Sequence, residues 1–336
     1  MRVLVCGGAG YIGSHMVREL IRAGHTPVVF DNLSTGHSWA LEEAFKGAAE
    51  KGLEPVLIKG DILNLSDVDE LFRQQPIDAV MHFSARSLVS ESVLRPDLYY
   101  HGILVGSLNL LAAASQAKVD KIIFSSTAAV YGTPEKMPID ESCPTQPITP
   151  YGQATKMVEM ILEDYAQAHG LKSVALRYFN AAGADPEGGL GEEHDPETHL
   201  IPNVLKAVLG QTPPLEIFGN DYPTPDGTPI RDYVFVGDVA RAHLLALDYL
   251  DRQPKPGFSA FNIGSGRGFS VMEVMAAAER VTGQWVPYTF SHRRLGDPPV
   301  LVASAEKAKR ELGWDPEITC LDEIIRSAWN WFRARN

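Results

Sequence analysis

Short apolar runs alternate with amphipathic stretches along the first half of the chain. The runs are β-branched or apolar and are bounded by polar or turn residues, which is typical of strands; they are Val3–Cys6, Pro27–Phe30, Glu54–Lys59, Ala79–Phe83, Lys121–Ser125 and Ser173–Leu176. The stretches between them space their apolar residues as helices do; they are Gly13–Ala23, Asp67–Gln74, Leu98–Ala117 and Gly152–His169. This alternation predicts an α/β fold, with a parallel sheet covered by helices on both faces.

The pattern changes from Asn180 onward. Gly183–His199 and Asn220–Pro229 are rich in Gly, Pro, Asp and Glu, so we expect long loops there, and such loops usually serve function. Helices are expected at Leu200–Leu209, Val239–Leu250, Ser304–Leu312 and Leu321–Arg333. The length and this change predict two domains, residues 1–180 and residues 181–336, with some later segments returning to the first.

Composition narrows the class of protein. The 336 residues carry a formal net charge of −12, which argues against a nucleic-acid or anionic-membrane partner because such partners need a basic face. A local group of arginines could still bind an anionic small ligand. Cys6, Cys143 and Cys320 lie far apart without metal-ligand spacing, so we expect no metal, no disulfide framework and a reducing compartment.

The sequence shows no membrane or export signal. No apolar run reaches the roughly eighteen residues that a membrane span needs. A strand-like run follows Met1 at once and leaves no room for a signal peptide. We therefore expect a cytoplasmic globular protein.

A glycine-rich turn, Gly7-Gly8-Ala9-Gly10-Tyr11-Ile12-Gly13, follows the first expected strand. Gly7, Gly10 and Gly13 allow a tight turn, a close approach of phosphate to the backbone, and close packing of helix on strand. The N–H groups and the positive end of the next helix then face a pyrophosphate. With a strand before it and a helix after it, this turn predicts a Rossmann dinucleotide site.

Asp31 ends the second expected strand, eighteen residues after Gly13. A carboxylate at this place accepts hydrogen bonds from the adenosine ribose and repels a 2′-phosphate. No Arg or Lys follows closely to offset that repulsion, so the predicted cofactor is NAD rather than NADP. Asp61, in Gly60-Asp61-Ile62, is a candidate for the adenine end, with a role in a turn as the alternative.

Hydroxyl groups gather near the predicted carboxyl edge of the sheet, where doubly wound folds bind their ligands. Thr127 follows the strand Lys121–Ser125, and Tyr151 opens a helix after Pro150. A strand-tip hydroxyl and a nearby tyrosine, beside a nicotinamide, suit removal of a proton from a carbinol. Since the pKa of tyrosine is about 10, the phenol needs positive charge nearby to act as a base at neutral pH.

Longer motifs extend along essentially the whole chain. They are GGAGYIGSH at 7–15, DNLSTG at 31–36, GDI at 60–62, FSSTAAVYG at 124–132, RYFNAAGAD at 177–185, HDPETHLIP at 194–202, IFGNDYPTPDGTPIRDYV at 217–234 and RRLGDP at 293–298. With these motifs the chain resembles the extended short-chain dehydrogenase/reductase family, and within it the UDP-sugar 4-epimerases. The resemblance implies a Rossmann domain with a smaller α/β domain that binds the nucleotide sugar. It also implies NAD as a tightly held cofactor and, usually, a homodimer, which the apolar stretch Leu104–Ala114 permits.

The resemblance implies an isomerisation of a UDP-hexose. Tyr151, assisted by Thr127, would take the proton of the sugar 4′-hydroxyl while a hydride passes to NAD. The 4-keto sugar would turn over within the site and receive the hydride on its other face. A 4,6-dehydratase, which carries an Asp-Glu pair after this threonine, is disfavoured because Ala128 and Ala129 stand there.

Further site residues follow from the resemblance. It implies cofactor contacts from Gly7, Gly10, Tyr11, Ile12, Gly13, Asp31, Asn32, Asp61, Ile62, Phe83, Ser84, Tyr151 and Tyr178. It implies substrate contacts from Asn180, His199, Leu200, Phe218, Arg231, Arg294, Asp297 and Leu301. Arg231 and Arg294 suit a diphosphate because guanidinium matches phosphate oxygens bidentately. Phe218 suits stacking on uracil and a place in the core equally, and His199 stands where relatives often have Asn.

One departure from the family pattern concerns the catalytic lysine. The pattern is Tyr-x-x-x-Lys, but here Thr155 is the fourth residue after Tyr151 and Lys156 comes one later. One step turns a side chain by about 100° around a helix. Either a π-bulge returns Lys156 to the nicotinamide ribose, or Thr155 occupies the lysine position and activity is weak or lost; a regular helix favours the second.

Two other positions bear on the activity. Gly102-Ile103-Leu104 replaces the Asn-Asn-Val usual in relatives, which removes a polar side chain near the active-site strand. Leu301 lies where relatives have a gate to the sugar 2′-substituent, and we hypothesise that UDP-N-acetylhexosamines enter. The alternatives to a UDP-hexose epimerase are a UDP-pentose or UDP-N-acetylhexosamine 4-epimerase, a biosynthetic paralogue with altered chemistry, and a binding protein whose catalysis has decayed.

Overall fold

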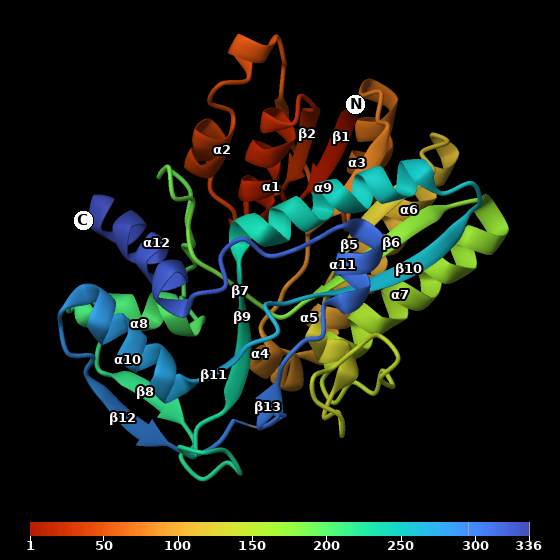
Figure 1. The fold of residues 1–336 in the computed structure, drawn as a ribbon. Coiled ribbons are helices and arrows are strands. Elements are labelled where there is room, and N and C mark those ends of the chain that lie inside the picture. Colours follow the sequence, from red (N-terminus) through yellow and green to blue (C-terminus); the bar gives the residue numbers. More distant parts are fainter. Residues whose placement is uncertain (295, 336) are drawn as a thin grey trace.

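A parallel sheet forms the centre of the first half of the molecule. The computed structural model describes residues 1–294 and 296–335, and its main sheet has seven strands in the order β10-β6-β5-β4-β1-β2-β3 (Figure 1). All neighbouring strands in it are parallel. The strands are β1 (Arg2–Cys6), β2 (Thr26–Asp31), β3 (Val56–Lys59), β4 (Ala79–His82), β5 (Lys121–Thr127), β6 (Lys172–Tyr178) and β10 (Gly257–Ile263). The sequence prediction of an α/β fold with a parallel sheet is confirmed.

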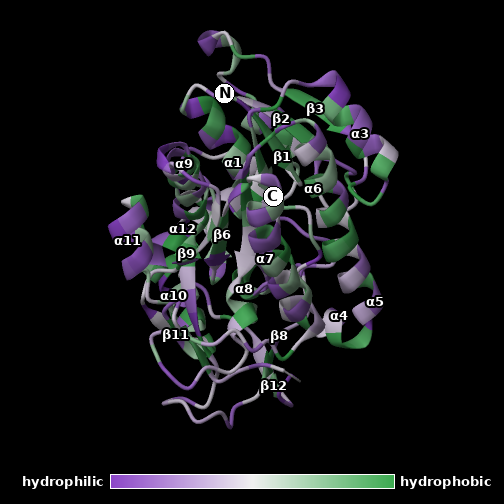
Figure 2. Cartoon of the chain, turned by 90° about the vertical axis from the view of Figure 1, so that its right-hand side faces the viewer, coloured by the Kyte–Doolittle hydropathy of each residue, from purple (hydrophilic) through white to green (hydrophobic). Residues whose placement is uncertain are grey.

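Helices cover both faces of this sheet, so each strand contributes to two cores. Val3 and Val5 of β1 pack in one core with α1 (Tyr11–Arg22), α2 (Ser38–Ala44) and α9 (Val236–Arg252). Leu4 and Cys6 point to the other face, in the core with α3 (Leu65–Gln74), α6 (Gly106–Gln116) and α7 (Pro150–His169). Burial of successive residues on opposite faces explains why the strands are almost wholly apolar. The strands β1 to β3 are mainly green in Figure 2, while α3 mixes purple and green.

The second half of the chain builds a smaller part beside the carboxyl edge of the sheet (Figure 1). Three helices, α8 (Leu200–Val208), α10 (Val271–Thr282) and α12 (Leu321–Ala334), pack on one another in a core of their own. Short strands accompany them: β7 (Asn180–Ala182), β8 (Leu215–Phe218), β9 (Ile230–Phe235), β11 (Gly268–Ser270), β12 (Tyr288–Ser291) and β13 (Val300–Leu301). β11, β9, β13 and β7 form one sheet, and β12 and β8 form another.

The two parts exchange segments. β6 ends at Tyr178 and β7 begins at Asn180, so the chain passes from the main sheet directly into the smaller part. The later helix α9 returns to pack on α1, and β10 pairs with β6 at the edge of the main sheet. The domain division at residue 180 therefore remains a prediction. The segments α9 and β10 follow residue 180 but pack with the first part.

The sequence prediction differed from the structure in several regions. The expected helix Leu98–Ala117 is divided into α5 (Pro96–Tyr99), a π-helical segment (Tyr100–Val105) and α6. Gly102 lies in this segment, where a side chain would meet nothing within 4 Å. Neither β8 to β13 nor α10 was predicted. Apart from β10, which has seven residues, these strands are short or mix charged and apolar residues, as in Ile230-Arg231-Asp232 of β9.

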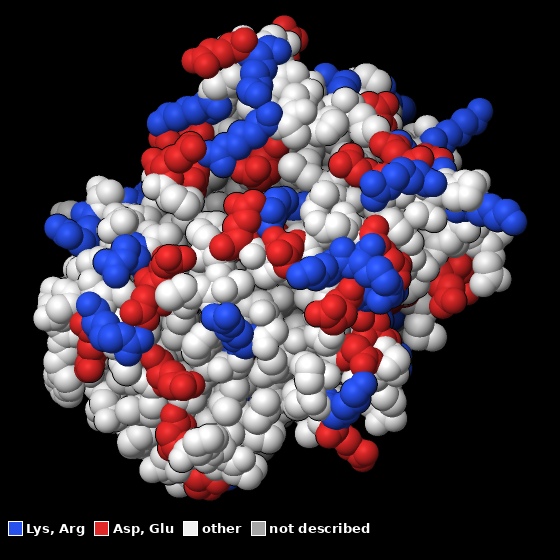
Figure 3. Space-filling model, viewed as in Figure 1, with Lys and Arg blue, Asp and Glu red and all other residues white. Residues whose placement is uncertain are grey.

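The remaining elements are short connectors. They are a 3-10 turn (Ala49–Lys51), α4 (Val89–Leu94), a second 3-10 turn (Ala128–Tyr131) and α11 (Glu306–Leu312). Within the described residues no helix has the length and apolar character that a membrane span requires. On the face shown in Figure 3, acidic and basic side chains are intermixed.

A buried ion pair joins the elements at the centre of the molecule. Nε and Nη2 of Arg177 on β6 donate to the two carboxylate oxygens of Glu159 on α7, at 2.9 and 2.6 Å. The Ser126 hydroxyl of β5 donates to the same carboxylate at 2.6 Å. Burial opposes the charge on Arg177, but Glu159 more than offsets it and raises the pKa of the guanidinium above its ordinary value. The pair therefore fixes α7 against β5 and β6.

The ion pair continues into a wider network. Nη1 of Arg177 donates to the Tyr131 hydroxyl at 2.9 Å, and that hydroxyl donates to Oδ1 of Asn262 on β10 at 2.7 Å. Burial raises the pKa of Tyr131 to about 12, although the nearby charge of Arg177 opposes the rise. All of these groups are buried and hydrogen-bonded, as buried polar groups must be for the fold to tolerate them.

Loss of the arginine should destabilise the fold strongly. In Arg177→Met the buried Glu159 carboxylate loses its charge partner, and we expect the free energy of unfolding to fall by about 3–5 kcal/mol. Guanidinium denaturation followed by circular dichroism measures the loss. Lys136→Met is the control, because Lys136 pairs with Asp140 on the surface, and it should leave stability unchanged within error. Equal stability of both variants would contradict the role of this network.

Candidate active site at the carboxyl edge of the sheet

The glycine turn between β1 and α1 is tight because two of its positions, Gly7 and Gly13, accept only glycine. Gly7 has a φ of +79°, in the left-handed region that favours glycine. A Cβ on Gly13 would lie 2.1 Å from the carbonyl oxygen of Gly7, so no other residue fits there without opening the turn. The backbone N–H groups of Tyr11 and Ile12 have no hydrogen-bond partner among the described residues. These free N–H groups at the start of α1 fit the pyrophosphate of a dinucleotide.

Asp31 lies at the end of β2 beside this turn. Its carboxylate is buried and accepts the N–H of Ala9 at 2.9 Å and of Leu33 at 2.8 Å. Within the described part of the chain, no Lys or Arg forms an ion pair with it. A fixed carboxylate without a basic neighbour fits a ribose with free hydroxyls better than one with a 2′-phosphate. The next residue, Asn32, donates from Nδ2 to Asp61 at 3.0 Å, which brings a second predicted contact to the same place.

The predicted catalytic pair lies together in the structure. Thr127 is the last residue of β5, and its Oγ1 accepts the N–H of Ala129 at 3.1 Å. Thr149 caps α7, which presents Tyr151 in the first turn of that helix. Burial raises the pKa of the Tyr151 phenol, and the hydrogen bond with Thr127 lowers it in part. A buried phenol in contact with a strand-tip hydroxyl can exchange a proton with a bound alcohol.

Other predicted cofactor residues surround this pair. Burial, and then the charge of Tyr151, raise the pKa of Tyr178 well above its ordinary value, which shows that the two phenols are close. The Phe83 ring lies 4.6 Å from the ring of His243, and Tyr178 lies 6.2 Å from it. Ser84 contacts the glycine turn, since its N atom would lie 2.8 Å from a Cβ on Gly7. The glycine turn, Ser84 and the end of β4 thus adjoin one another.

The lysine position is occupied by a threonine. α7 is an unbroken α-helix from Pro150 to His169, so no π-bulge follows Tyr151. Thr155 is buried, and its Oγ1 donates to the carbonyl of Tyr151 at 2.9 Å. Lys156 points to another side of the helix, where Nζ donates to the carbonyl of Thr145 at 2.6 Å. The structure contradicts the π-bulge alternative and matches the one in which Thr155 takes the place of the lysine.

The predicted substrate residues come from several short strands of the smaller part. Asn180 of β7 pairs with Tyr233 of β9, and Leu301 of β13 pairs with Arg231 of β9. Arg231 forms an ion pair with Asp297, and its Nη2 donates to the carbonyl of Pro298 at 2.7 Å. The pairing of β7, β9 and β13 brings Asn180, Arg231 and Leu301 to one sheet, and the ion pair with Arg231 holds Asp297 beside it.

Phe218 and Arg294 form a second predicted pair. The guanidinium carbon of Arg294 lies 3.9 Å from the centroid of the Phe218 ring. Burial lowers the pKa of Arg294, although nearby acidic groups including Asp297 oppose this. The face of Phe218 is thus covered by a cation, as in a stacking site, rather than by core side chains. Leu295, which belongs to the same motif, lies outside the described residues.

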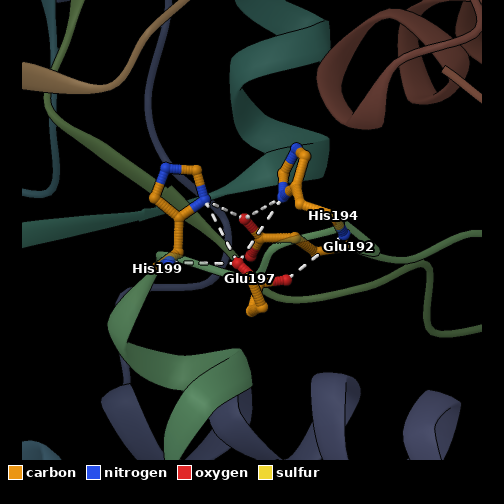
Figure 4. A group of neighbouring side chains, drawn as sticks. All are labelled: Glu192, His194, Glu197 and His199. Atoms are coloured by element: carbon orange, nitrogen blue, oxygen red, sulfur yellow. Dashed lines mark hydrogen bonds and ion pairs between the residues drawn. The ribbon is translucent and has the colours of Figure 1, made fainter. Parts of the chain in front are cut away.

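His199 belongs to a cluster of four ionisable side chains. His199 was predicted as a site residue from the sequence, but the other three were not. Glu192, His194, Glu197 and His199 point toward one another from the loop before α8 (Figure 4). Nδ1 of His199 forms a short hydrogen bond with Glu192, and Nδ1 of His194 lies 3.5 Å from the same carboxylate. The spacing Glu-x-His-x-x-Glu-x-His was a visible signal, but it follows no helix or strand period and so gave no indication of a shared position.

Comparisons with known proteins agree with this arrangement. A family model described as the NAD dependent epimerase/dehydratase family matches residues 3–264. A UDP-glucose 4-epimerase of Lacticaseibacillus casei is 48% identical over 331 residues, covering 98% of this chain and 96% of the relative. The UDP-glucose 4-epimerase of Azospirillum brasilense is 50% identical over 333 residues, covering 99% of this chain and 92% of the relative.

Solved structures are similar over the same length. The UDP-glucose 4-epimerase of Brucella ovis, in complex with NAD, has a TM-score of 0.91 and 45% identity, covering 98% of each chain. That of Bifidobacterium longum, in complex with NAD⁺ and UDP, has a TM-score of 0.94 and 38% identity, covering 100% of this chain and 99% of the other.

The glycine turn should be sensitive to a single methyl group. In Gly13→Ala the new Cβ would lie 2.1 Å from the Gly7 carbonyl oxygen, so the turn must open and its free N–H groups must move. We expect affinity for NAD⁺ to fall at least roughly tenfold, the loss of about one charged hydrogen bond. Calorimetric titration with NAD⁺ measures it. Gly257→Ala is the control for adding a methyl group to a glycine, since Gly257 has no left-handed φ and a Cβ there meets nothing within 4 Å; an unaltered affinity in Gly13→Ala would contradict the assignment.

Proposed function

The chain belongs to the NAD dependent epimerase/dehydratase family, and on that basis we propose that it is an NAD-dependent UDP-hexose 4-epimerase, an isomerase that interconverts UDP-glucose and UDP-galactose. The observation that carries this proposal is the contact of Thr127 with Tyr151 at the strand edge. This contact suits proton exchange with a sugar hydroxyl, as an epimerase requires. The relatives that are 48% and 50% identical over nearly the whole chain are UDP-glucose 4-epimerases.

Each part of the site has a role in this reaction. The glycine turn would hold NAD, which would supply a reversible hydride acceptor for the sugar, so the overall reaction would have no redox change. Tyr151 takes the proton of the 4′-hydroxyl and later gives it back, and Thr127 hydrogen-bonds the same groups. Asp31 holds the adenosine ribose. A 4-epimerisation requires no proton transfer at C5′ or C6′ of the sugar. It is therefore compatible with Ala128 and Ala129, whose methyl groups cannot act as acids or bases.

The smaller part holds the nucleotide. Arg231 and Arg294 bind the diphosphate, and Phe218, which already carries a cation on its face, stacks on the uracil. Asp297 orients Arg231 through their ion pair. Leu301 lies beside Arg231 in the sheet, where its short side chain leaves room for a larger 2′-substituent; a structural relative from Campylobacter jejuni is a UDP-Glc/GlcNAc 4-epimerase with 37% identity.

The threonine at position 155 limits the rate of this chemistry. Burial raises the pKa of Tyr151, and only the Thr127 hydroxyl acts in the other direction. Lys156 donates to Thr145 and so does not supply the missing positive charge. The positive charge that lowers the Tyr151 pKa would then have to come from bound NAD⁺, so we expect the enzyme to be slow at neutral pH and faster in alkaline solution.

Assembly and location complete the proposal. Leu108 on α6 and Met160 on α7 are large apolar side chains with exposed fractions of 41% and 56%, and such exposure marks contact surfaces when it is grouped. We assign this face, on two helices of the first part, to a homodimer. The three free cysteines support a reducing compartment, and we place the enzyme in the cytoplasm.

Product analysis tests the function. The protein is incubated separately with UDP-glucose, UDP-galactose, UDP-GlcNAc and UDP-xylose, and the products are separated by chromatography. We expect UDP-glucose and UDP-galactose to interconvert and UDP-GlcNAc to bind. Turnover of UDP-xylose alone would indicate a pentose epimerase, and binding without turnover of any sugar would indicate that catalysis has decayed.

Restoring a lysine should accelerate the reaction. In Thr155→Lys an ammonium one helical turn from Tyr151 lowers the phenol pKa, so the pH–rate profile should move to lower pH and the rate at pH 7 should rise roughly tenfold or more. Gln153→Lys adds the same charge on a different side of the same helical turn and should change neither. An unchanged profile in a folded Thr155→Lys protein would show that position 155 does not control Tyr151.

The dimer surface is tested by charge. Leu108→Glu combined with Met160→Glu places carboxylates on both helices and should convert a dimer to a monomer, as measured by size-exclusion chromatography with light scattering. Trp285→Gln removes another large apolar side chain, 68% exposed, away from these helices, and should leave the mass unchanged. A double variant with the mass of the unmodified protein would rule out this surface.

A further inference from the structure

A buried carboxylate holds His199 at the border between protein and solvent. The side chain of Glu192 is 4% exposed, whereas that of His199 is 43% exposed. Nδ1 of His199 is hydrogen-bonded to Oε1 of Glu192. Because Nδ1 is occupied by a buried acceptor, the ring orientation is set, and Nε2 of this partly exposed side chain has no hydrogen-bond partner among the described residues.

The surrounding charges keep this ring positive. Glu197 lies 4.0 Å from Nδ1 of His199 through its Oε1 and is itself buried. Burial alone would lower the His199 pKa, but Glu192 first and Glu197 second raise it to about 9. His199 is thus an imidazolium at neutral pH.

Other ionisable groups around the ring do not reverse this result. His194 from the same loop lies 3.5 Å from Glu192 and 3.6 Å from Glu197. Lys206 of α8 lies 4.0 Å from Glu197. Tyr11 of α1 faces both carboxylates, and burial followed by their charges raises its pKa well above the ordinary value, so it stays neutral.

Glu197 also shapes the loop that carries His199. Its carboxylate accepts the N–H of Thr198 at 2.8 Å, of His199 at 3.0 Å and of His194 at 3.3 Å. His199 is the N-cap residue of α8, which begins at Leu200. The backbone N–H groups of Leu200 and Ile201 have no partner among the residues that the structure describes. The imidazolium therefore adjoins free donors at the positive end of a helix.

We propose that Glu192 is a positioning residue, which fixes the His199 imidazolium so that its Nε2–H donates to the diphosphate of the nucleotide sugar. This inference rests on the proposed function only in taking a UDP-sugar as the ligand. A charged donor forms a stronger hydrogen bond to phosphate than a neutral one. The network makes the affinity for the diphosphate depend on pH, with the imidazolium present below the pKa of His199 and lost as the pH rises through it.

Direct titration of the ring is the first test. In uniformly ¹⁵N-labelled protein without substrate, the His199 nitrogen signals, assigned by their loss in His199→Asn, should still be those of an imidazolium at pH 8. In Glu192→Gln they should become those of neutral imidazole between about pH 6 and 7, the ordinary range of histidine. Neutral His199 signals at pH 7 in the unmodified protein would overturn the proposal, whatever the protein catalyses.

Binding of UDP-glucose is the second test. Calorimetric titrations use the NAD-loaded protein with Tyr151→Phe, so that no conversion occurs. Glu192→Gln should bind UDP-glucose as tightly as its parent at pH 5.5 and roughly tenfold more weakly at pH 8. His199→Asn should bind with one affinity at both pH values. A merely structural role of Glu192 would weaken binding equally at both, and that result would overturn the proposal.

Matched controls separate the remaining explanations. Glu193→Gln removes the neighbouring carboxylate, which pairs with Arg335 instead of His199, and should leave the pH dependence intact. Stoichiometric binding of Zn²⁺ that is lost in Glu192→Gln would overturn the proposal, because a metal on Nδ1 requires a neutral ring. pH-dependent binding in a protein that converts no UDP-sugar would refute the proposed function and support this inference.

Discussion

The buried pair of Arg177 and Glu159 determines where the reactive groups stand. Tyr151 lies on α7 and Thr127 on β5. Their contact therefore requires that the helix and the strand keep a fixed position relative to each other. The Glu159 carboxylate joins them, since it belongs to α7 and accepts from Ser126, next to Thr127, and from Arg177 of β6. A buried charge pair with all its hydrogen bonds made tolerates little displacement, because each lost bond leaves an unpaired group in the core.

A second buried carboxylate fixes the position of the strands and loops in the smaller part. Asp232 is fully buried on β9, next to Arg231. It accepts the N–H groups of Ser265, Gly266 and Ala303 at 2.8, 3.0 and 3.1 Å. Burial raises the Asp232 pKa, and these hydrogen bonds oppose the rise. The loops after β10 and β13 are thereby fixed to the strand that presents Arg231, so the two parts of the site meet in a constant geometry.

The site combines a conventional binding scaffold with an unusual base. Under the proposed function, the glycine turn and Asp31 bind the dinucleotide, and the Arg231–Asp297 pair binds the nucleotide sugar. At the centre, however, the usual ammonium is absent, since Thr155 donates back to the helix and Lys156 binds the Thr145 carbonyl. Binding and catalysis are therefore separable in this protein, because the groups that hold the ligands differ from the group that would activate Tyr151.

The sequence by itself determined the main sheet, the dinucleotide turn and the residue types of the catalytic pair. These depend on local rules: period-2 and period-3.6 apolar patterns, glycine geometry and the position of Asp31 after a strand. It also showed that the lysine is displaced, but only the tertiary structure decided between a bulge and a regular helix, because the packing of α7 sets that choice. Likewise, only the structure placed Glu192 and Glu197 around His199. The sequence indicated that some later segments return to the first part, but only the structure identified them as α9 and β10. Such contacts join residues far apart or in aperiodic loops, and no local pattern encodes them.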